Sequence, residues 1–320
     1  MNERTRISQV VKEARRIAIL SHQNPDGDAI GSTLAAYFVF QTAGKEAIPF
    51  NPDPVPSDLA FLPGSGEIRS VLPLDLSFDL FLVLDCGSME RMGDLRQAVQ
   101  GLVINIDHHR SNGRFGGLNW VEEEASSTGE MVYRLLLEEM GLPLPREAAI
   151  CLYTAILTDT GCFRFPNTTA ESLRIAGQLV RAGACPERIA AHLYEQRGLG
   201  QLRVLGEMLT GLQVSSDGRI AWGVITQEMI QRGQIAIQDT EGFVNYPRSL
   251  RGVEVALLFK EVALNRYRVS LRSKGNIDVE KVASAFGGGG HPNAAGCTVQ
   301  GNLEEVKTSV LEEIRRWIVA

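Results

Sequence analysis

The chain has 320 residues, of which 44% are hydrophobic and 22% are charged, and its formal net charge is −6. This length and composition are typical of a globular protein with one large domain or two ordinary ones. The negative net charge excludes a general nucleic-acid coat protein, whose surface carries a basic stripe. It leaves open a short nucleic acid that metal ions and a few arginines bind locally.

Several patterns of secreted and membrane proteins do not occur. Residues 1–16 are charged and helical in pattern, without the apolar segment of a signal peptide. The longest mostly apolar run, residues 148–157, is shorter than the roughly 20 residues that span a bilayer. The five cysteines are scattered without a C-x-x-C pair, which favours reduced thiols over disulfides or structural zinc. We therefore expect a cytoplasmic protein with no membrane partner.

Short apolar runs alternate with helical patterns in the first half of the chain. Residues 16–20 predict a buried strand, residues 28–44 the helix that follows it, and residues 47–50 a second strand. Two further apolar runs, residues 78–86 and 101–109, are bounded by polar turns. This alternation predicts a mainly parallel sheet with helices on both faces.

The pattern changes along the second half. Residues 126–212 are mostly helical, and the part from residue 186 onwards is expected to form a helical connector. A hairpin around Asp217-Gly218 and two antiparallel strands within residues 253–273 come next. A helix, a glycine run, a strand and a final helix complete the chain. We expect an α/β protein with a first domain over residues 1–185, a linker over residues 186–215, and a smaller α/β domain with a mixed sheet over residues 216–320.

Metal-capable side chains stand where several of these elements end. Because the carboxyl ends of parallel strands meet at one edge of a sheet, where ligands bind, we expect these side chains to lie together. They are His22, Asp26 and Asp28 after the first strand, Asp85 after a second, Asp107, His108 and His109 after a third, and Asp159 at the end of a helix.

Each of these residues has an ordinary structural explanation when it is taken alone. Asp28 fits a helix N-cap, and Asp85 or Asp159 fits a cap or a turn. The Asp-His-His run fits a surface loop. Taken together, however, three of the five histidines fall at these strand ends, and His291 lies in a second unusual loop. The joint pattern favours a functional site.

The donor types in this pattern indicate the metal and the reaction. Carboxylate oxygen and imidazole nitrogen favour manganese or a similar divalent ion, whereas structural zinc prefers thiolates. Two such ions about 3.5–4 Å apart can share a water, lower its pKa and stabilise an in-line phosphoryl displacement. An aspartate suits the bridging position because each of its oxygens can bind one ion. Gly27 and Gly31 are expected to let the backbone turn tightly so that the side chains converge.

Four motifs, in order, resemble those of the DHH-family phosphoesterases. They are HQNPDGDAIGS from His22, the strand end at Asp85, DHH from Asp107 and TDTG from Thr158. The second half resembles the DHH-associated domain through VSLRSKG and GGGGHPNAAG. The resemblance covers nearly the whole chain, whose length is similar to the stand-alone bacterial oligoribonuclease (nanoRNase) and pAp phosphatase type. It implies a parallel-sheet DHH catalytic domain, a helical connector and a DHH-associated substrate-binding domain, with the active site in the cleft between the domains.

The resemblance also implies two metal sites that share one ligand. Asp85 bridges the two sites, and Asp107 orients His108 without binding a metal itself. His109 contacts the scissile phosphate and stabilises its developing charge. The ions are expected to be two Mn²⁺, with Mg²⁺ or Co²⁺ as substitutes. The ligands of the first ion are His22, Asp26 and Asp85, and those of the second are Asp28, Asp85, His108 and Asp159.

The glycine run in the second half has two interpretations. Four consecutive glycines form either a flexible turn or a backbone that closely approaches a ligand. The resemblance favours a phosphate cradle of backbone amides, with an arginine that binds phosphate bidentately nearby. The residues expected to bind substrate are Gly288, Gly289, Gly290 and His291 in the run, and Arg272 and Ser273 on a strand. Two phosphates held at a fixed distance favour very short oligonucleotides.

The resemblance implies a manganese-dependent phosphodiesterase. It is expected to release mononucleotides from short 5′-phosphorylated RNA or dinucleotides and to convert pAp to AMP. Hydrolysis of linear pApA from cyclic-dinucleotide turnover is an alternative for the same site. A non-catalytic nucleotide sensor is another, although a sensor needs no water-activating metal pair. A homodimer is expected by analogy with the family.

Overall fold

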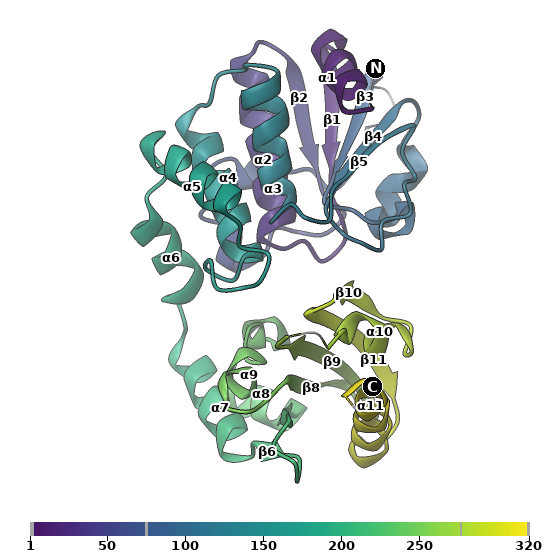
Figure 1. Ribbon diagram of the computed structural model, residues 1–320, viewed down its shortest axis with the longest axis vertical. Coiled ribbons are helices and arrows are strands. Elements are labelled where there is room, and N and C mark those ends of the chain that lie inside the picture. The colour runs from purple at the N-terminus through teal and green to yellow at the C-terminus, as the bar shows by residue number, and fades with distance from the viewer. Residues whose placement is uncertain (1–2, 74–75, 276, 319–320) are drawn as a thin grey trace. The chain divides into compact units, whose positions relative to one another are not determined.

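The computed structural model describes residues 3–73, 76–275 and 277–318. The chain divides into two compact units, residues 1–196 and 197–320, which Figure 1 colours purple to teal and green to yellow. Each unit has its own sheet and its own hydrophobic core. No helix among the described residues is both long enough and apolar enough to cross a membrane.

The first unit contains a sheet of five parallel strands, which confirms the predicted α/β class. The order of the strands across the sheet is β2-β1-β3-β4-β5. Leu20 of β1 pairs with Val83 of β3, and Leu84 of β3 pairs with Ile106 of β4. The carboxyl ends of these three strands therefore meet at one edge. The strands are β1 (Arg16–Leu20), β2 (Glu46–Phe50), β3 (Leu80–Leu84), β4 (Val103–Asp107) and β5 (Leu118–Val121).

The α-helices in the described part of this unit pack on one face of the sheet. Ile19 of β1 faces them, whereas the next residue, Leu20, faces the opposite side. There the sheet is covered by Met92 and Leu95 of the 3₁₀ segment η3 (Met89–Ala98). The expected helices on both faces are therefore found only in part, because α-helices cover one face and a 3₁₀ segment covers the other. The helices are α1 (Glu3–Glu13), α2 (Gly27–Thr42), α3 (Thr128–Tyr133), α4 (Arg146–Asp159), α5 (Ala170–Arg181) and α6 (Pro186–Tyr194).

Helix breakers explain the difference between the two faces. Between β2 and β3 the chain passes through three prolines within residues 51–56, and each proline removes a backbone donor. Between β3 and β4, Gly93 has φ 56° and ψ −139°, which interrupts η3. These connections cover the sheet with short turns and loops instead of α-helices.

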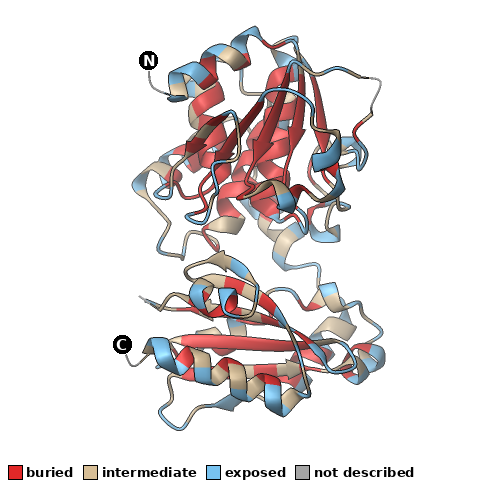
Figure 2. Cartoon of the chain, turned by 90° about the vertical axis from the view of Figure 1, so that its right-hand side faces the viewer, coloured by how far each residue is buried: buried red, intermediate tan, exposed pale blue. Residues whose placement is uncertain are grey.

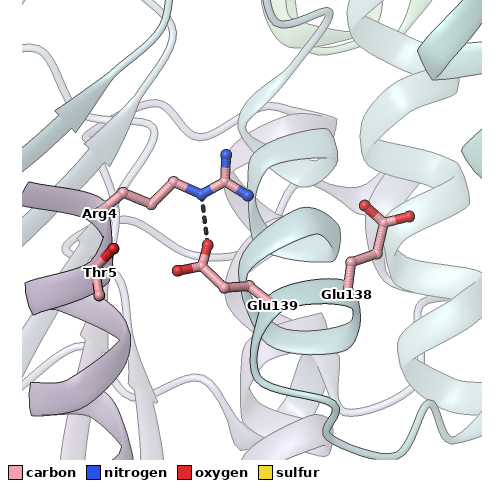
Figure 3. Close-up of a pocket in the computed structure, with 4 residues that line it drawn as sticks. All are labelled: Arg4, Thr5, Glu138 and Glu139. Atoms are coloured by element: carbon pink, nitrogen blue, oxygen red, sulfur yellow. Dashed lines mark hydrogen bonds and ion pairs between the residues drawn. The ribbon is translucent and has the colours of Figure 1, made fainter. Parts of the chain in front are cut away.

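Polar contacts fix helix α1 to the π-helical segment η4 (Arg134–Glu139). Arg4 Nε donates a hydrogen bond of 2.5 Å to Glu139 Oε2, across a surface hollow that Figure 3 shows. Glu138 points away from Arg4 in this view and accepts a hydrogen bond of 2.6 Å from Arg174. Because both carboxylates already have cationic partners, the hollow belongs to the packing of α1.

The second unit is built on a mixed sheet of six strands, which confirms the predicted architecture. The order is β10-β11-β9-β8-β7-β6, and of these neighbours only β8 and β7 are parallel. The predicted hairpin at Asp217-Gly218 joins β6 to β7, and the predicted antiparallel pair is β8 with β9. The strands are β6 (Gln213–Val214), β7 (Ile220–Ile225), β8 (Val255–Ala263), β9 (Arg266–Ser273), β10 (Gly289–His291) and β11 (Ala294–Gln300).

Helices pack on both faces of this second sheet. Leu257 of β8 lies in one core with α10 and α11, and Leu258 lies in another with α7 and α8. Figure 2 shows the buried strands in red and the outer sides of the helices in pale blue. The helical segments are α7 (Leu199–Thr210), α8 (Gln227–Gly233), η5 (Ile237–Thr240), α9 (Asn245–Ser249), α10 (Val279–Ser284) and α11 (Leu303–Ile318).

The segment expected to be a linker, residues 186–215, is divided between the two units. Helix α6 belongs to the first unit, and helix α7 belongs to the second, which begins at Arg197. Gly198 precedes α7, and its amide donates a hydrogen bond of 2.7 Å to Gln201 Oε1. The connection is thus two helices separated by a short non-helical segment.

Candidate metal centre

The candidate site lies at the carboxyl edge of the first sheet, where the strand order reverses between β1 and β3. Such a reversal opens a crevice in which ligands bind. His22 and Asp28 follow β1, Asp85 follows β3, and Asp107 is the last residue of β4. These residues are buried, with exposed fractions of 3%, 1%, 1% and 0%. Acidic side chains so deeply buried need ionic partners.

Three groups of ligand atoms contain Asp85: two correspond to the expected ligand sets, and the third is Asp85, Asp107 and His109. In the first group, ligand atoms of His22, Asp26 and Asp85 lie within 4.8 Å of one another, and His22 Nε2 is 3.4 Å from Asp85 Oδ2. In the second group, ligand atoms of Asp28, Asp85 and His108 also lie within 4.8 Å of one another, and His108 Nε2 is 3.8 Å from Asp85 Oδ1. The two oxygens of Asp85 therefore face different groups.

Asp159 adds a further carboxylate to the second group. It is the last residue of α4, and its Oδ2 lies 3.6 Å from His108 Nε2. Asp28 Oδ2 lies 3.7 Å from the same nitrogen. His108 Nε2 is thus surrounded by oxygens of three carboxylates, while His108 Nδ1 lies 3.1 Å from the Ala125 carbonyl oxygen. Since a carbonyl only accepts, this contact places the proton on Nδ1 and the lone pair, which can coordinate a cation, on Nε2.

Asp26 has a second role as the N-cap of α2. Its Oδ1 accepts hydrogen bonds from the amides of Asp28 and Ala29, both at 3.1 Å. The explanation of Asp28 as the cap is therefore wrong, because Asp28 lies inside the first turn. The cap fixes Asp26 and Asp28 relative to each other on one rigid helix end.

Backbone amides and an amide side chain hold the carboxylates of the second group, and sequence reasoning missed these contacts. The amides of Thr128 and Gly129 donate to Asp28 at 2.6 and 2.8 Å. Asn167 Nδ2 donates to Asp159 Oδ2 at 3.1 Å. In the sequence, the run SSTG at residues 126–129 indicates only the start of a helix. The first amides of a helix have no partner within the helix, so this start presents the amides of Thr128 and Gly129 to Asp28.

Asp107 contacts His109 and not His108. Asp107 Oδ1 lies 2.7 Å from His109 Nδ1, and Asp107 Oδ2 accepts a hydrogen bond of 2.6 Å from Asn112. The expectation that Asp107 orients His108 is therefore wrong, because the Ala125 carbonyl does so. Burial lowers the pKa of His109, but the hydrogen bond with Asp107 and the charge of Asp85 raise it overall. His109 is thus a favoured place for a positive charge.

Gly27 and Gly31 serve close helix packing. A Cβ on Gly31 would lie 2.6 Å from the Cys151 carbonyl oxygen, and one on Gly27 would lie 2.4 Å from Thr158 Oγ1. Both glycines lie within α2 and contact α4. The expected turn role is wrong: these glycines instead let α2 and α4 approach closely, which brings Asp28 and Asp159 to the same cluster.

Burial and mutual repulsion oppose ionisation of two carboxylates. Burial raises the pKa of Asp28 well above its usual value, and the charges of Asp85 and Asp159 raise it further. Burial and the charges of Asp26 and Asp85 likewise raise the pKa of Asp159. Burial alone would raise the pKa of Asp85, but the hydrogen bond with His22 and the nearby imidazoles lower it. Divalent cations would relieve this repulsion, and a set of oxygens and imidazole nitrogens fits them chemically.

Comparisons with known proteins agree with this geometry. The model of the DHH family, N-terminal domain, matches residues 16–156, and that of the DHHA1 domain matches residues 224–320. The chain is 34% identical to the bifunctional oligoribonuclease and PAP phosphatase NrnA of Thermus thermophilus, over 97% of this chain and 92% of the relative. The chain belongs to the DHH family of phosphoesterases.

Two further relatives support this DHH assignment. NrnA of Bacillus subtilis, also named a bifunctional oligoribonuclease and PAP phosphatase, is 29% identical over 92% of this chain and 93% of its own. The crystal structure of an exopolyphosphatase-related protein from Bacteroides fragilis superposes with a TM-score of 0.90 at 30% identity, covering 98% of this chain and 96% of that one. The protein is therefore an enzyme of the DHH type, with a DHHA1 domain in its second unit.

The glycine run of the DHHA1 domain is partly a strand. Gly289–His291 forms β10 and pairs antiparallel with β11, so the expectation of a loop is wrong there. A Cβ on Gly288 would lie 2.2 Å from the Gly296 carbonyl oxygen, so the position just before β10 requires glycine. The Gly288 amide donates to the Ala283 carbonyl at 2.9 Å. Gly288 therefore has a packing role, and its amide is already used.

Arg272 and Ser273 end strand β9 of the DHHA1 domain. Arg272 Nη1 donates to a backbone carbonyl at 2.9 Å, and burial lowers the pKa of Arg272 although Glu241 opposes this effect. Ser273 donates to the Pro292 carbonyl at 3.3 Å and accepts a hydrogen bond of 2.8 Å from Asn293. The Ser273 hydroxyl therefore stabilises the turn between β10 and β11, a role that the sequence did not predict.

Lys260 of β8 is a buried cation that sequence reasoning missed. It is 1% exposed, and its Nζ donates to Glu241 Oε1 at 2.5 Å. Lys260 pairs in register with Arg268 of β9, and the charges of Arg268 and Arg272 lower its pKa in addition to burial. The only signal in the sequence was a lysine within the apolar run VALLFKEVA. Lys260, Arg268 and Arg272 thus lie on one face of β8 and β9, with Glu241 paired to Lys260.

Proposed function

We propose that this protein is a two-metal phosphodiesterase that hydrolyses short oligoribonucleotides to mononucleotides and converts pAp to AMP. The names of the two NrnA relatives support this substrate class. The observation that carries the proposal is Asp85, whose Oδ2 faces His22 at 3.4 Å and whose Oδ1 faces His108 at 3.8 Å. A carboxylate between two donor groups suits a pair of divalent ions.

Each ion is assigned a set of ligands in this proposal. We assign manganese to both positions, with Mg²⁺ or Co²⁺ as substitutes, because the donors are carboxylates and imidazoles. When bound, the ions would activate a water and neutralise charge on the phosphate. The first set is His22, Asp26 and Asp85, and the second is Asp28, Asp85, His108 and Asp159.

His109 is assigned to the scissile phosphate. Asp107 Oδ1 lies 2.7 Å from His109 Nδ1, which fixes the orientation of the imidazole ring. The raised pKa of His109 favours the imidazolium form, which can donate from Nε2 to a phosphate oxygen and stabilise its charge. Asp107 is a positioning residue that acts through His109. Asp85 would bridge the two ions, and it also forms an ion pair with His22.

The DHHA1 unit is assigned to a terminal phosphate of the substrate. Lys260, Arg268 and Arg272 supply positive charge on β8 and β9, and Arg272 offers the planar fork that binds phosphate bidentately. Gly289, Gly290 and His291 remain the proposed contacts of the glycine run, whereas Ser273 and Gly288 stabilise the turn that carries it. A fixed spacing between the two phosphates favours short chains.

One assay panel tests this function. The full chain is incubated with Mn²⁺ and either pAp, pApA or end-labelled RNAs of two to ten nucleotides, with Asp85→Asn as the inactive control. We expect hydrolysis of pAp and of the shortest RNAs, and a rate that falls with length. A rate that is flat or rises with length contradicts the fixed spacing, and preference for pApA supports the alternative in cyclic-dinucleotide turnover. Nucleotide binding without turnover identifies a sensor instead.

The homodimer expected from the family belongs to the same proposal and is measured by sedimentation.

A further inference from the structure

Segment η3 places Arg91 directly beside the first group of ligand atoms. The amide of Gln23 donates to the Arg91 carbonyl at 2.7 Å, so the loops after β1 and β3 are joined next to His22. Gly93, two residues on, has φ 56°, and a Cβ there would lie 2.5 Å from Gln23 Nε2. The backbone at Arg91 is therefore fixed by close packing, while the Arg91 side chain is exposed.

The guanidinium of Arg91 faces a ring nitrogen of His22 that cannot accept its proton. Arg91 Nη2 lies 3.2 Å from His22 Nδ1, and the same Nδ1 lies 2.7 Å from the Gln23 carbonyl oxygen. A carbonyl oxygen only accepts, so Nδ1 carries the proton and Nε2 is left for the group at Asp85. Two donors do not hydrogen-bond to each other, so His22 leaves the Arg91 donors available.

Within the described part of the chain, Arg91 lies beside the metal-ligand cluster without the carboxylate partner that several other arginines of the unit have. Arg4, Arg134 and Arg174 each form an ion pair with a glutamate. Across residues 3–73, 76–275 and 277–318, no carboxylate lies within ion-pair distance of Arg91. The Arg91 guanidinium lies beside His22 Nδ1, on the side of the ring opposite the ligand atom Nε2. Its planar set of N–H donors suits a phosphate oxyanion.

We propose that Arg91 is a substrate-binding residue that donates hydrogen bonds to a non-bridging oxygen of the phosphate held at the metal centre. This inference rests on the proposed function in one respect: the anion is the phosphate that the enzyme cleaves. Arg91 binds that phosphate on the side of His22, whereas His109 binds it on the side of β4. The two cations thus hold the phosphate from the segments that follow β3 and β4.

The test is calorimetric titration of inorganic phosphate into the Mn²⁺-loaded full chain. Arg91→Met removes the donors and keeps the length of the stem, and Arg96→Met is the matched control because Arg96 is an exposed arginine of the same segment η3. We expect phosphate affinity to fall about 10- to 100-fold in Arg91→Met, as for loss of hydrogen bonds to a charged group. In Arg96→Met it stays within about twofold, since surface changes are nearly neutral.

Mn²⁺ titration of the same variants separates phosphate binding from metal binding. Mn²⁺ affinity is expected to be equal in the wild type and in both variants. Equal phosphate affinity in Arg91→Met and wild type overturns the inference, as does phosphate binding too weak to detect in the wild type. Loss of Mn²⁺ binding in Arg91→Met also overturns it, because Arg91 would then support the metal ligands. If the wild type hydrolyses none of the substrates while Arg91→Met still weakens phosphate binding, the proposed function fails, and Arg91 remains a phosphate-binding residue of the metal centre.

Discussion

Asp28 accepts a hydrogen bond of 2.6 Å from the amide of Thr128, although 100 positions separate the two residues in the chain. The amide of Gly129 donates to the other oxygen of Asp28 at 2.8 Å. The start of α3 therefore orients both oxygens of a carboxylate that belongs to α2. The metal centre depends on the packing of α2, α3 and α4 as much as on its ligands.

Gly129→Ala is expected to damage this packing. A Cβ there would lie 2.6 Å from Ala155 Cβ and 3.3 Å from Asp28 Oδ1. We expect the free energy of unfolding to fall by about 1–3 kcal/mol, as for overpacked cores, and Mn²⁺ affinity to fall with it. Urea unfolding and Mn²⁺ titration measure both.

Gly177→Ala is the matched control for Gly129→Ala. Gly177 lies within α5, and a Cβ there would meet nothing within 4 Å. This variant is expected to gain up to about 1 kcal/mol, because alanine favours helix over glycine. The prediction is contradicted if Gly129→Ala and Gly177→Ala have the same free energy of unfolding and the same Mn²⁺ affinity. Helices α2, α3 and α4 would then tolerate a wider separation.

Asp159→Asn is expected to flatten the pH dependence of stability in the metal-free protein. Burial and the charges of Asp26 and Asp85 raise the folded-state pKa of Asp159 above 3.8, the unfolded value. The neutral form is therefore favoured in the folded state, and the free energy of unfolding falls as the pH rises from 3.8 through the raised pKa. Asparagine removes this loss but also removes a metal ligand. Urea unfolding from pH 4 to 8, without and with Mn²⁺, tests this: a variant with the same slope as the wild type contradicts it.

Asp107→Asn is expected to alter catalysis through His109. The hydrogen bond with Asp107 raises the pKa of His109, so the imidazolium persists to higher pH. Removing the charge lowers that pKa, and the basic limb of the kcat profile should move to lower pH. We expect kcat to fall about 10- to 100-fold, as for loss of a residue that orients a ligand. Bound Mn²⁺ is the control: if the metal is lost and the profile keeps its shape, Asp107 is a ligand and not a positioning residue.

Arg272→Met is expected to raise KM for pAp with a smaller effect on kcat. Arg272 is assigned to a terminal phosphate, and loss of hydrogen bonds to a charged group weakens binding by about 10- to 100-fold. Arg266→Met is the control, since Arg266 is an exposed arginine of the same strand, β9. Equal KM values in the two variants would remove Arg272 from the substrate site.

The sequence was sufficient to predict the sheet of the first unit and the acidic and histidine cluster at its edge. Apolar runs such as residues 16–20 are buried on both faces, so their composition is enough to identify them as strands. Strand β5 has no counterpart among the predicted strands, because it has only four residues and two of them are half-exposed. The family resemblance, and not the periodicity, supplied the expected ligand sets.

Long-range contacts explain what the sequence could not predict. The amides of Thr128 and Gly129, and the side chain of Asn167, reach the carboxylates only after the helices pack. The partner of Asp107 depends on the turn after β4, where His109 and not His108 folds back. Gly289–His291 becomes a strand only because β11 is beside it. None of these contacts has a local signal.

The most direct test of the central claim is the number of Mn²⁺ ions bound per chain, measured together with the hydrolysis of pAp. We predict two ions in the wild type, one in Asp159→Asn and none bound tightly in Asp85→Asn, with hydrolysis lost in Asp85→Asn, because Asp85 serves both groups at 3.4 and 3.8 Å. A single ion in the wild type, or an Asp85→Asn variant that retains both ions and hydrolysis, would contradict a two-metal centre bridged by Asp85.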